Sequence, residues 1–214
     1  MNVKRKINLL FSMSFLAMLS ACTEEALSNN DAEMSYINAL DEQATFYIKK
    51  SSNDRDIYDS DYRTISLLSG EASYDIEHDW FSYEKSYIGV EDTNTRSEQV
   101  YISTNLRDKR SYWVVAWLDN RDYDISVFQK RKSNMADVIR VRIFANDRYA
   151  VFIDGSNASS FITDKGEVSD YFSVHNCSEL SVENNNINLC SADFGLSYLA
   201  VVDEHGLVSL IEEP

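Results

Sequence analysis

Two short runs of aspartate bring several carboxylates close together in the sequence. The first contains Asp54, Asp56, Asp59 and Asp61, and the second contains Asp119, Asp122 and Asp124. Hard cations such as Ca²⁺ favour several carboxylate and carbonyl oxygens supplied by one turn. Neither run has the glycine of the helix-flanked calcium loop, and acidic residues are frequent throughout this chain. A solvated acidic surface is therefore the favoured interpretation, with a calcium site as the weaker alternative.

The histidines offer little support for catalysis. His78, His175 and His205 lie far apart, and only His78 adjoins both an acid and a large aromatic residue, in Asp79-Trp80. The chain contains no nucleophile elbow, no phosphate-binding glycine loop, no metalloprotease helix and no zinc-ribbon spacing. We therefore expect no catalytic residues, no metal and no cofactor.

Aromatic residues crowd the first half of the chain, and they include Trp80, Tyr83 and Tyr87. Exposed aromatic rings can stack on sugar rings or anchor a protein partner. Packing on the faces of β-strands explains most of them equally well. The three residues are candidates for a ligand or partner contact, with burial in a core as the competing interpretation.

The elements that would position these residues are predicted to be strands. Short runs rich in Tyr, Phe, Val, Ile and Thr alternate with polar turn clusters, and no window sustains a helical period over three turns. In the first part of the chain we expect strands near 35–39, 45–49, 63–68, 73–77, 85–90, 99–104, 112–118 and 125–130. In the second part we expect them near 138–145, 149–153, 160–163, 171–175, 179–182, 186–189, 196–202 and 207–211.

The two sets of strands are related to each other. The stretch from Ile37 to Ile48 has a counterpart from Ile143 to Ile153, each with a strand, an acidic turn and a second strand. The hairpin from Ser111 to Phe128 likewise parallels the stretch from Ser197 to Leu210. Because the matched ends occur in the same order, we predict an internal duplication. Each copy has the size of a small β-sandwich.

These patterns predict an all-β protein with two tandem immunoglobulin-like β-sandwich domains after a cleaved signal peptide. We expect a signal peptide over residues 1–21, a tether over 22–33, a first sandwich over 34–132 and a second over 133–214. The basic run from Lys130 to Lys132 falls at the junction. A solvated linker is its favoured role, and a contact with an acidic neighbouring domain is the alternative.

The N-terminal stretch resembles the signal of bacterial lipoproteins. Lys4, Arg5 and Lys6 precede an uncharged, largely apolar run, which ends in Leu19-Ser20-Ala21-Cys22. That run is shorter than the roughly 20 apolar residues of a membrane-spanning helix. The resemblance implies that Cys22 receives lipid on its sulfur and becomes the first residue of the mature chain. Because Thr23 rather than aspartate follows Cys22, the same resemblance implies an outer-membrane location, facing the periplasm or the cell surface.

With Cys22 lipidated, Cys177 and Cys190 remain as an even pair in an oxidising compartment. We expect them to form a disulfide across a hairpin, with Leu180, Val182, Ile187 and Leu189 facing the core and Glu183 to Asn186 forming the turn. Metal ligation is disfavoured because only His175 stands near in the sequence.

The charge of the chain narrows its choice of partners. The sequence has 20 basic and 35 acidic residues, a formal charge of −15. Removing the first 21 residues takes away three basic ones, so that 17 basic and 35 acidic residues give −18. This charge argues against binding nucleic acid and against lying on anionic lipid through basic patches.

The paired motifs also resemble a known family. The turn after Ile37-Asn38-Ala39, the later hairpin beginning Ser111-Tyr112-Trp113 and the restart at Val138-Ile139-Arg140 resemble the bacterial extracytoplasmic family known as domain of unknown function 4397. The resemblance covers most of residues 34–212. It implies tandem β-sandwich modules on secreted proteins and lipoproteins, and it carries no catalytic residue with it.

Together these features lead us to expect a non-enzymatic envelope lipoprotein, acting as a membrane-tethered binding or structural module. Its partners would be the membrane, through lipidated Cys22, and a protein of the envelope. The alternative is a carbohydrate-binding accessory protein, or an enzyme, that uses the aromatic and acidic residues of the first domain.

Overall fold

The computed structural model describes residues 29–50, 56–81, 83–97, 99–155 and 158–214. Within these residues the chain forms sixteen strands and one short 3₁₀ helix, η2 (Ser60–Tyr62). Each of the sixteen strand regions predicted from the sequence overlaps one of the observed strands. No helix in the described ranges combines the length and apolar character needed to cross a membrane.

The first domain is a sandwich of two four-stranded sheets. Its strands are β1 (Asn29–Asn38), β2 (Ala44–Lys50), β3 (Arg63–Leu67), β4 (Ile76–Phe81), β5 (Ser86–Asp92), β6 (Gln99–Thr104), β7 (Arg110–Asp119) and β8 (Asp122–Gln129). One sheet has the order β4-β1-β7-β8 and the other β3-β2-β5-β6. All pairs are antiparallel except β1 with β7, which are parallel.

The second domain repeats this arrangement. Its strands are β9 (Ile139–Ala145), β10 (Ala150–Ile153), β11 (Ser159–Ile162), β12 (Phe172–Val174), β13 (Leu180–Val182), β14 (Asn185–Ile187), β15 (Ser197–Asp203) and β16 (Gly206–Glu212). Its sheets have the orders β12-β9-β15-β16 and β11-β10-β13-β14. Adding eight to each strand number of the first domain gives the second, and β9 pairs with β15 in parallel, as β1 does with β7.

This equivalence confirms the predicted correspondence between the two halves. Both are β-sandwiches with the two-sheet architecture of immunoglobulin domains. In their strand order, the first strand of each copy lies between the fourth and the seventh. The first strand therefore belongs to one sheet and the second strand to the other, and the turn between them crosses one end of the sandwich.

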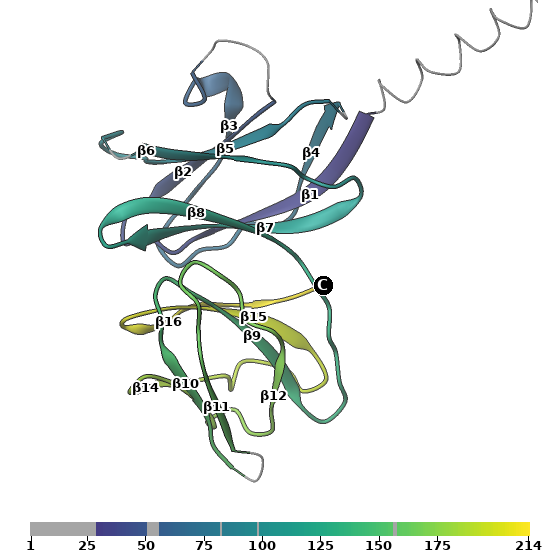
Figure 1. Ribbon diagram of the computed structural model, residues 1–214, viewed down its shortest axis with the longest axis vertical. Coiled ribbons are helices and arrows are strands. Elements are labelled where there is room, and N and C mark those ends of the chain that lie inside the picture. The colour runs from purple at the N-terminus through teal and green to yellow at the C-terminus, as the bar shows by residue number, and fades with distance from the viewer. Residues whose placement is uncertain (1–28, 51–55, 82, 98, 156–157) are drawn as a thin grey trace, which may run out of the picture.

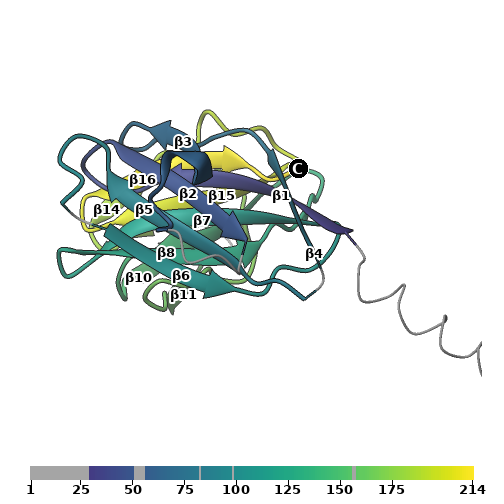
Figure 2. The same ribbon diagram turned by 90° about the horizontal axis from the view of Figure 1, so that it is seen from above.

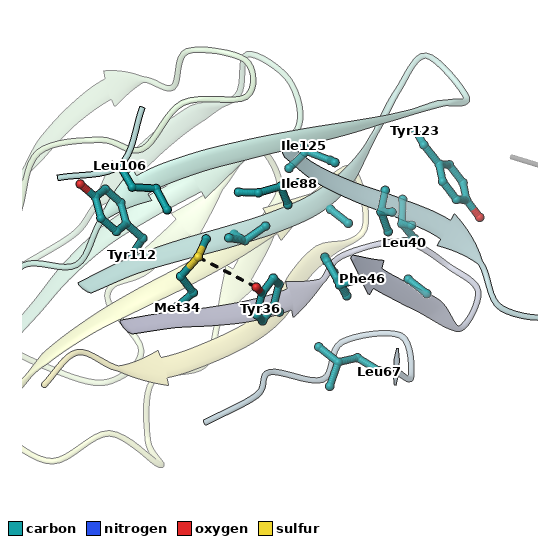
Figure 3. Close-up of a cluster of buried hydrophobic side chains, with 14 of the residues drawn as sticks. Met34, Tyr36, Leu40, Phe46, Leu67, Ile88, Leu106, Tyr112, Tyr123 and Ile125 are labelled. Carbon is teal, nitrogen blue, oxygen red and sulfur yellow. Dashed lines mark hydrogen bonds between the residues drawn. The ribbon is translucent and has the colours of Figure 1, made fainter. Parts of the chain in front are cut away.

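Alternation of side chains along the strands creates a core inside each sandwich. Met34 and Tyr36 on β1 point into the first core together with Val114 on β7, whereas Ile37 and Val115 point to the other side of the sheet. Figure 3 shows part of this first core, with Phe46 and Ile88 contributed by the facing sheet. A second core of the same kind fills the second domain.

A third apolar cluster lies between the two domains. It is formed by residues on the outward faces of β1, β7, β9 and β15, and its buried members are Ile37, Trp113, Val115, Trp117, Phe144, Leu199 and Val201. The sheets containing β1 and β9 therefore pack against each other and are buried on both faces. The result is a stack of four sheets along the long axis of the molecule, with the first domain above the second in Figure 1 and nearly superimposed on it in Figure 2.

One domain boundary differs from that predicted. Strand β1 begins at Asn29, so residues 29–33 of the expected tether belong to the first domain. Most of these residues are polar, so the sequence pattern did not predict a strand here. Their backbone nevertheless pairs with β4, from Asn29 opposite Phe81 to Glu33 opposite Glu77. Residues 1–28, including the expected signal peptide and Cys22, lie outside the described residues.

The basic run at the junction is only partly solvated. Arg131 and Lys132 are exposed, whereas Lys130 is buried in the first domain. Its ammonium lies 4.1 Å from the centre of the Trp113 ring, donates to Ser35 Oγ at 2.8 Å and pairs with Asp75. Lys130 is therefore a structural residue of the first sandwich and not part of a free linker.

Candidate functional site

A cleft of about 390 Å³ opens at the end of the interface between the domains. The turns after β1 and β7 in the first domain meet the equivalent turns after β9 and β15 in the second. The first domain contributes Ala39, Asp41, Leu118, Asn120 and Arg121, and the second contributes Asn146, Asp147, Tyr149, Lys165, Asp203, Glu204 and His205. The duplication thus places equivalent turns of the two domains around one cleft, together with Lys165 from the loop after β11.

The first-domain wall depends on a tight turn between β7 and β8. Asp119 pairs with Asp122, which leaves Asn120 and Arg121 as a two-residue turn, and both have positive φ angles of 52° and 94°. Turns of this kind match the twist of the flanking strands, and asparagine tolerates the left-handed conformation better than most residues. The Asn120 side chain donates to Asp119 Oδ1 at 2.7 Å, so the turn is held by its own polar groups.

The second-domain wall is built in a similar way. The Tyr149 hydroxyl donates to Asn146 Oδ1 at 2.8 Å, which fastens the turn between β9 and β10. In the turn between β15 and β16, Asp203 Oδ1 accepts hydrogen bonds from the backbone N–H groups of His205 and Gly206, at 2.7 and 3.1 Å. These bonds fix the backbone of the wall and leave the side chains of Glu204 and His205 exposed.

The cleft carries mixed charge with an acidic excess. Four carboxylates (Asp41, Asp147, Asp203 and Glu204) face two cationic side chains (Arg121 and Lys165) among the lining residues. Lys165 pairs across the domain boundary with Asp119, and hydrogen bonding to that carboxylate raises the pKa of Lys165. Such a lining suits a polar ligand with a cationic group, because desolvation would be offset by several oxygen acceptors.

Tyr149 stays protonated at neutral pH. Burial raises its pKa to about 12, and the negative charges of Asp147, Asp203 and Glu204 add to this effect. The hydroxyl therefore acts as a hydrogen-bond donor and not as an acid or base. The cleft can bind and orient a ligand. Its lining also contains an exposed imidazole–carboxylate pair, in which His205 Nε2 lies 3.5 Å from Glu204 Oε1.

A buried cluster of polar side chains around Glu213 connects the two domains. Glu213 is 0% exposed, and its carboxylate pairs with Arg142, which is also buried. It accepts a hydrogen bond from Trp113 Nε1 at 2.9 Å and another from the Tyr171 hydroxyl. Since Trp113 belongs to the first domain and the other groups to the second, this cluster connects the domains through hydrogen bonds as well as apolar contacts.

A second connection lies closer to the cleft. Trp117 Nε1 donates to Ser126 Oγ at 3.0 Å, and the Ser126 hydroxyl donates to the Gly166 carbonyl oxygen at 2.7 Å. Gly166 belongs to the second domain and lies directly against the indole: a Cβ added there would be 2.6 Å from Trp117 Cζ2. The loop containing Lys165 and Gly166 is thus seated on the first domain.

Of the predicted acidic cluster in the first domain, the structure describes Asp56, Asp59 and Asp61. Asp54 lies outside the described residues. Asp56 accepts a hydrogen bond from the Tyr58 backbone, and Asp59 accepts one from the backbone of Asp61 as the N-cap of η2. No three acidic, histidine or cysteine side chains within the described residues gather to hold an ion. The run of aspartates therefore serves turn geometry.

The three predicted aromatic contacts do not come together. Trp80 is 3% exposed and belongs to the first core, since it alternates inward on β4. Tyr83 is 65% exposed in the turn after β4, where its ring stacks on Phe81. Tyr87 lies on the outer face of the sheet β3-β2-β5-β6, beside Tyr101. Core burial therefore applies to Trp80, and the three residues do not share one exposed surface.

That outer face holds a different group of aromatic and polar residues, which the sequence did not single out. A small pocket of about 130 Å³ there is lined by Tyr47, Tyr58, Glu91 and Arg96, among others. Gly89 lacks the side chain that would collide with Tyr58, which lies over the sheet. The Tyr58 hydroxyl is buried and has no hydrogen-bond partner in the structure.

The predicted disulfide is present between Cys177 and Cys190, with the Cα atoms 4.8 Å apart. Leu180, Val182 and Ile187 are buried as expected. The turn is shorter than predicted, because Val182 pairs with Asn185 and leaves only Glu183 and Asn184 between the strands. This register places the two cysteines opposite each other just beyond the hairpin.

His78 forms the imidazole–hydroxyl contact that a hydrolase would use, with Nε2 3.1 Å from Ser86 Oγ. Both side chains are buried, and the imidazole stacks on Trp80 inside the first sandwich. Burial lowers the pKa of His78 to about 4, and the neighbouring Lys50 acts in the same direction. A neutral, enclosed imidazole satisfied by a serine is a core residue.

The residues that define the interdomain cleft were missed because they belong to turns, which carry no motif. A signal for the interface itself was present. The runs Tyr112–Leu118 and Tyr198–Val202 are apolar at nearly every position, which indicates strands buried on both faces. A scan of protein-family models and a search of curated proteins each find no match to this chain.

Proposed function

We propose that the protein is a non-enzymatic lipoprotein of the outer membrane that binds an envelope partner at the cleft between its two domains. The observation that carries the proposal is the position of this cleft. Ala39, on the cleft wall, directly follows β1, whereas the chain from Cys22 enters β1 at Asn29. A strand of this length spans roughly 30 Å. A tether at Cys22 would therefore present the cleft on the side away from the membrane.

The packing of the domains supports a binding role for the cleft. Its two walls come from different domains, yet they are fixed by the apolar cluster around Trp113 and Phe144 and by the buried Glu213. A preorganised site loses less conformational entropy on binding than a flexible one. The acidic excess of the lining favours a partner that offers basic or hydrogen-bond-donating groups.

Membrane attachment is tested by replacing Cys22 with serine in the full chain. The variant should appear in the soluble periplasmic fraction, whereas the wild-type protein should stay with the membranes. An unchanged distribution between the fractions would sink the proposed anchor. Circular dichroism of both proteins serves as the folding control, because all strands of the two sandwiches lie within residues 29–212.

Binding at the cleft is tested by photo-crosslinking in intact cells. A crosslinking amino acid at Asn120 lies in the cleft, and the same amino acid at Ser103 lies on the exposed outer face of the first domain. A discrete adduct from position 120 alone is the expected result. Equal adducts from both positions, or none from position 120, would contradict a partner site in the cleft.

A second candidate function is carbohydrate binding on the outer face of β3-β2-β5-β6. Tyr101 is 58% exposed and its ring lies 6.4 Å from that of Tyr87, beside the pocket that holds the unpartnered Tyr58 hydroxyl. Aromatic rings next to polar side chains suit a sugar. If this function holds, Tyr101→Ala should abolish retention on a polysaccharide gel that retains the wild type, and Asn120→Ala should not.

A further inference from the structure

Exposed basic side chains gather at the end of the first domain where β1 begins. Strand β7 starts there, because its parallel register places Arg110 opposite Ala32. The loop that precedes β7 lies against the start of β1, since the Lys109 backbone N–H donates to the Asp31 carbonyl oxygen at 2.6 Å. Arg107, Lys109 and Arg110 are all exposed in this loop.

Two neighbouring segments add to this group. The antiparallel register of β7 and β8 pairs Tyr112 with Gln129, and the Lys130 N–H bonds to the Ser111 carbonyl. The exposed Arg131 and Lys132 follow Lys130 directly. Lys85 follows β4, whose last residue lies opposite Asn29. We call the six exposed cations Lys85, Arg107, Lys109, Arg110, Arg131 and Lys132 the basic end of the molecule.

Acidic side chains lie at this end as well, and they include Asp31, Asp79, Glu84 and Asp108. Asp108 Oδ1 accepts the backbone N–H of Asp31 at 3.0 Å, and Glu84 Oε2 accepts the backbone N–H of Phe81 at 2.9 Å. The interdomain cleft, whose lining has four carboxylates and two cationic side chains, lies at the opposite end of β1 and β7. The two ends of the first domain therefore differ in their exposed charge.

The basic end also carries exposed aromatic rings. Phe81 is 40% exposed and Tyr83 is 65% exposed, and their rings stack in parallel with centroids 5.7 Å apart. Register places Phe81 directly opposite Asn29, where the chain from Cys22 enters the fold. Aromatic side chains beside basic ones are typical of surfaces that contact the headgroup layer of a membrane.

We propose that the basic end, together with Phe81 and Tyr83, docks on an anionic lipid headgroup surface and orients the two domains on the membrane. Taken as a whole, the charge of −18 on the chain from Cys22 onward argues against contact with anionic lipid, but the exposed cations gathered at this end allow a local contact. The acidic turns lie roughly 30 Å away along β1 and β7. Interactions between exposed charges are screened over about 8 Å at physiological salt, so the lipid surface senses mainly the nearest groups. The proposal rests on the proposed tether, which would hold this end against the bilayer.

The test uses the mature chain, residues 22–214, carrying Cys22→Ser so that no lipid is attached. This chain retains every described residue of both sandwiches. Its partition onto vesicles of phosphatidylglycerol and phosphatidylcholine is compared by sedimentation with partition onto vesicles of phosphatidylcholine alone. We expect binding to the anionic vesicles that falls with added salt. The triple variant Arg107→Glu, Lys109→Glu, Arg110→Glu should lower the partition coefficient by about tenfold or more.

Matched variants separate this surface from other effects. Arg121→Glu with Arg148→Glu reverses two exposed charges at the opposite end, and it should leave partition unchanged. Phe81→Ser with Tyr83→Ser should weaken partition severalfold, whereas Tyr101→Ser, which removes an exposed aromatic ring elsewhere, should not. Circular dichroism confirms that each variant is folded.

Two outcomes would overturn the proposal: binding to phosphatidylcholine vesicles that is as strong as binding to the anionic vesicles, or equal loss from charge reversal at either end. Because the protein in this assay carries no lipid, its failure would leave the anchor at Cys22 intact. Conversely, release of the Cys22→Ser variant from cells would not bear on whether this surface recognises headgroups.

Discussion

The buried carboxylate of Glu213 balances the charge of Arg142 between the domains. Removing one member of a buried ion pair leaves the other uncompensated, which typically costs about 3–5 kcal/mol. Glu213→Ala would also deprive Trp113 Nε1 and the Tyr171 hydroxyl of their acceptor. We therefore expect the variant to lose about that much free energy of unfolding, measured by urea denaturation.

The neighbouring residue provides the control for this experiment. Glu212 is exposed, and Glu212→Ala should change the free energy of unfolding by less than about 0.5 kcal/mol. A double variant with Arg142→Met and Glu213→Leu should recover much of the lost stability, because no unpaired charge remains. Equal effects of the two alanine variants would show that Glu213 has no special role.

His78 should make stability depend on pH. Its pKa in the folded protein is about 4, below the usual value of 6.5, because burial disfavours the charged imidazole. Between pH 6.5 and pH 4 the unfolded chain binds a proton here that the folded chain does not. Stability is therefore lost as the pH falls, by about 2 kcal/mol between pH 7 and pH 5. His78→Gln should flatten this slope in urea titrations at the two pH values.

The matched substitution at the exposed His205, in the turn between β15 and β16, controls for the introduced glutamine. It should leave the slope between pH 7 and pH 5 as in the wild type. The prediction fails if both variants show the same pH dependence, since the loss of stability would then arise from other groups.

At the level of single residues, the sequence predicted contacts that depend on local spacing. Cys177 and Cys190 flank a hairpin, and hairpin geometry brings such residues together. Whether Trp80 and Tyr87 are buried or exposed depends on which face of each strand points to the core and on what covers the other face. The local sequence does not contain that information. The surroundings of Tyr87 are set by the neighbouring strand β6, which places Tyr101 beside it.

Among the elements, the loop before β12 is the one that seals the domain interface near the cleft. Gly166 has a φ angle of 69° and packs on Trp117. Alanine at this position would meet both backbone strain and a clash with the indole ring. We expect Gly166→Ala to destabilise the protein by about 2–4 kcal/mol in urea denaturation.

Gly195 separates the two causes. It also has a positive φ, of 91°, but an added Cβ would have no atom within 4 Å. Gly195→Ala therefore measures backbone strain alone and should cost about 1 kcal/mol. If the two alanine variants were equally stable, the contact between Gly166 and Trp117 would contribute nothing to the interface.

The strands themselves were largely predictable, because alternation of apolar and polar residues is set by the geometry of a sheet. The start of β1 was the clearest miss. Residues Asn29 to Asp31 are polar, yet their backbone pairs with β4 at the edge of the domain. Backbone pairing at a sheet edge requires no apolar side chain, and such a strand end leaves no mark in the composition.

For the molecule as a whole, the apolar cluster between the sheets of β1 and β9 packs the two domains into one rigid unit. The repeated topology could be inferred from matched motifs, but the packing of one copy on the other could not. This packing requires the outward face of the β1 sheet and that of the β9 sheet to be apolar and complementary in shape. Phe144 of the second domain, for example, stacks on Phe128 and contacts the Trp117 ring edge-on in the first domain. We therefore expect both domains to unfold together.

The positions of the tryptophans and of the disulfide allow this coupling to be measured. All three tryptophans belong to the first domain, whereas the Cys177–Cys190 bond lies in the second. Replacing both cysteines with serine should lower the stability of the second domain by about 3 kcal/mol. If the domains unfold as one unit, the urea transition seen by tryptophan fluorescence must shift with the transition seen by far-ultraviolet circular dichroism. A dichroism change that precedes an unshifted fluorescence transition would show that the domains are independent, and the cleft between them would then lose the rigidity that its binding role requires.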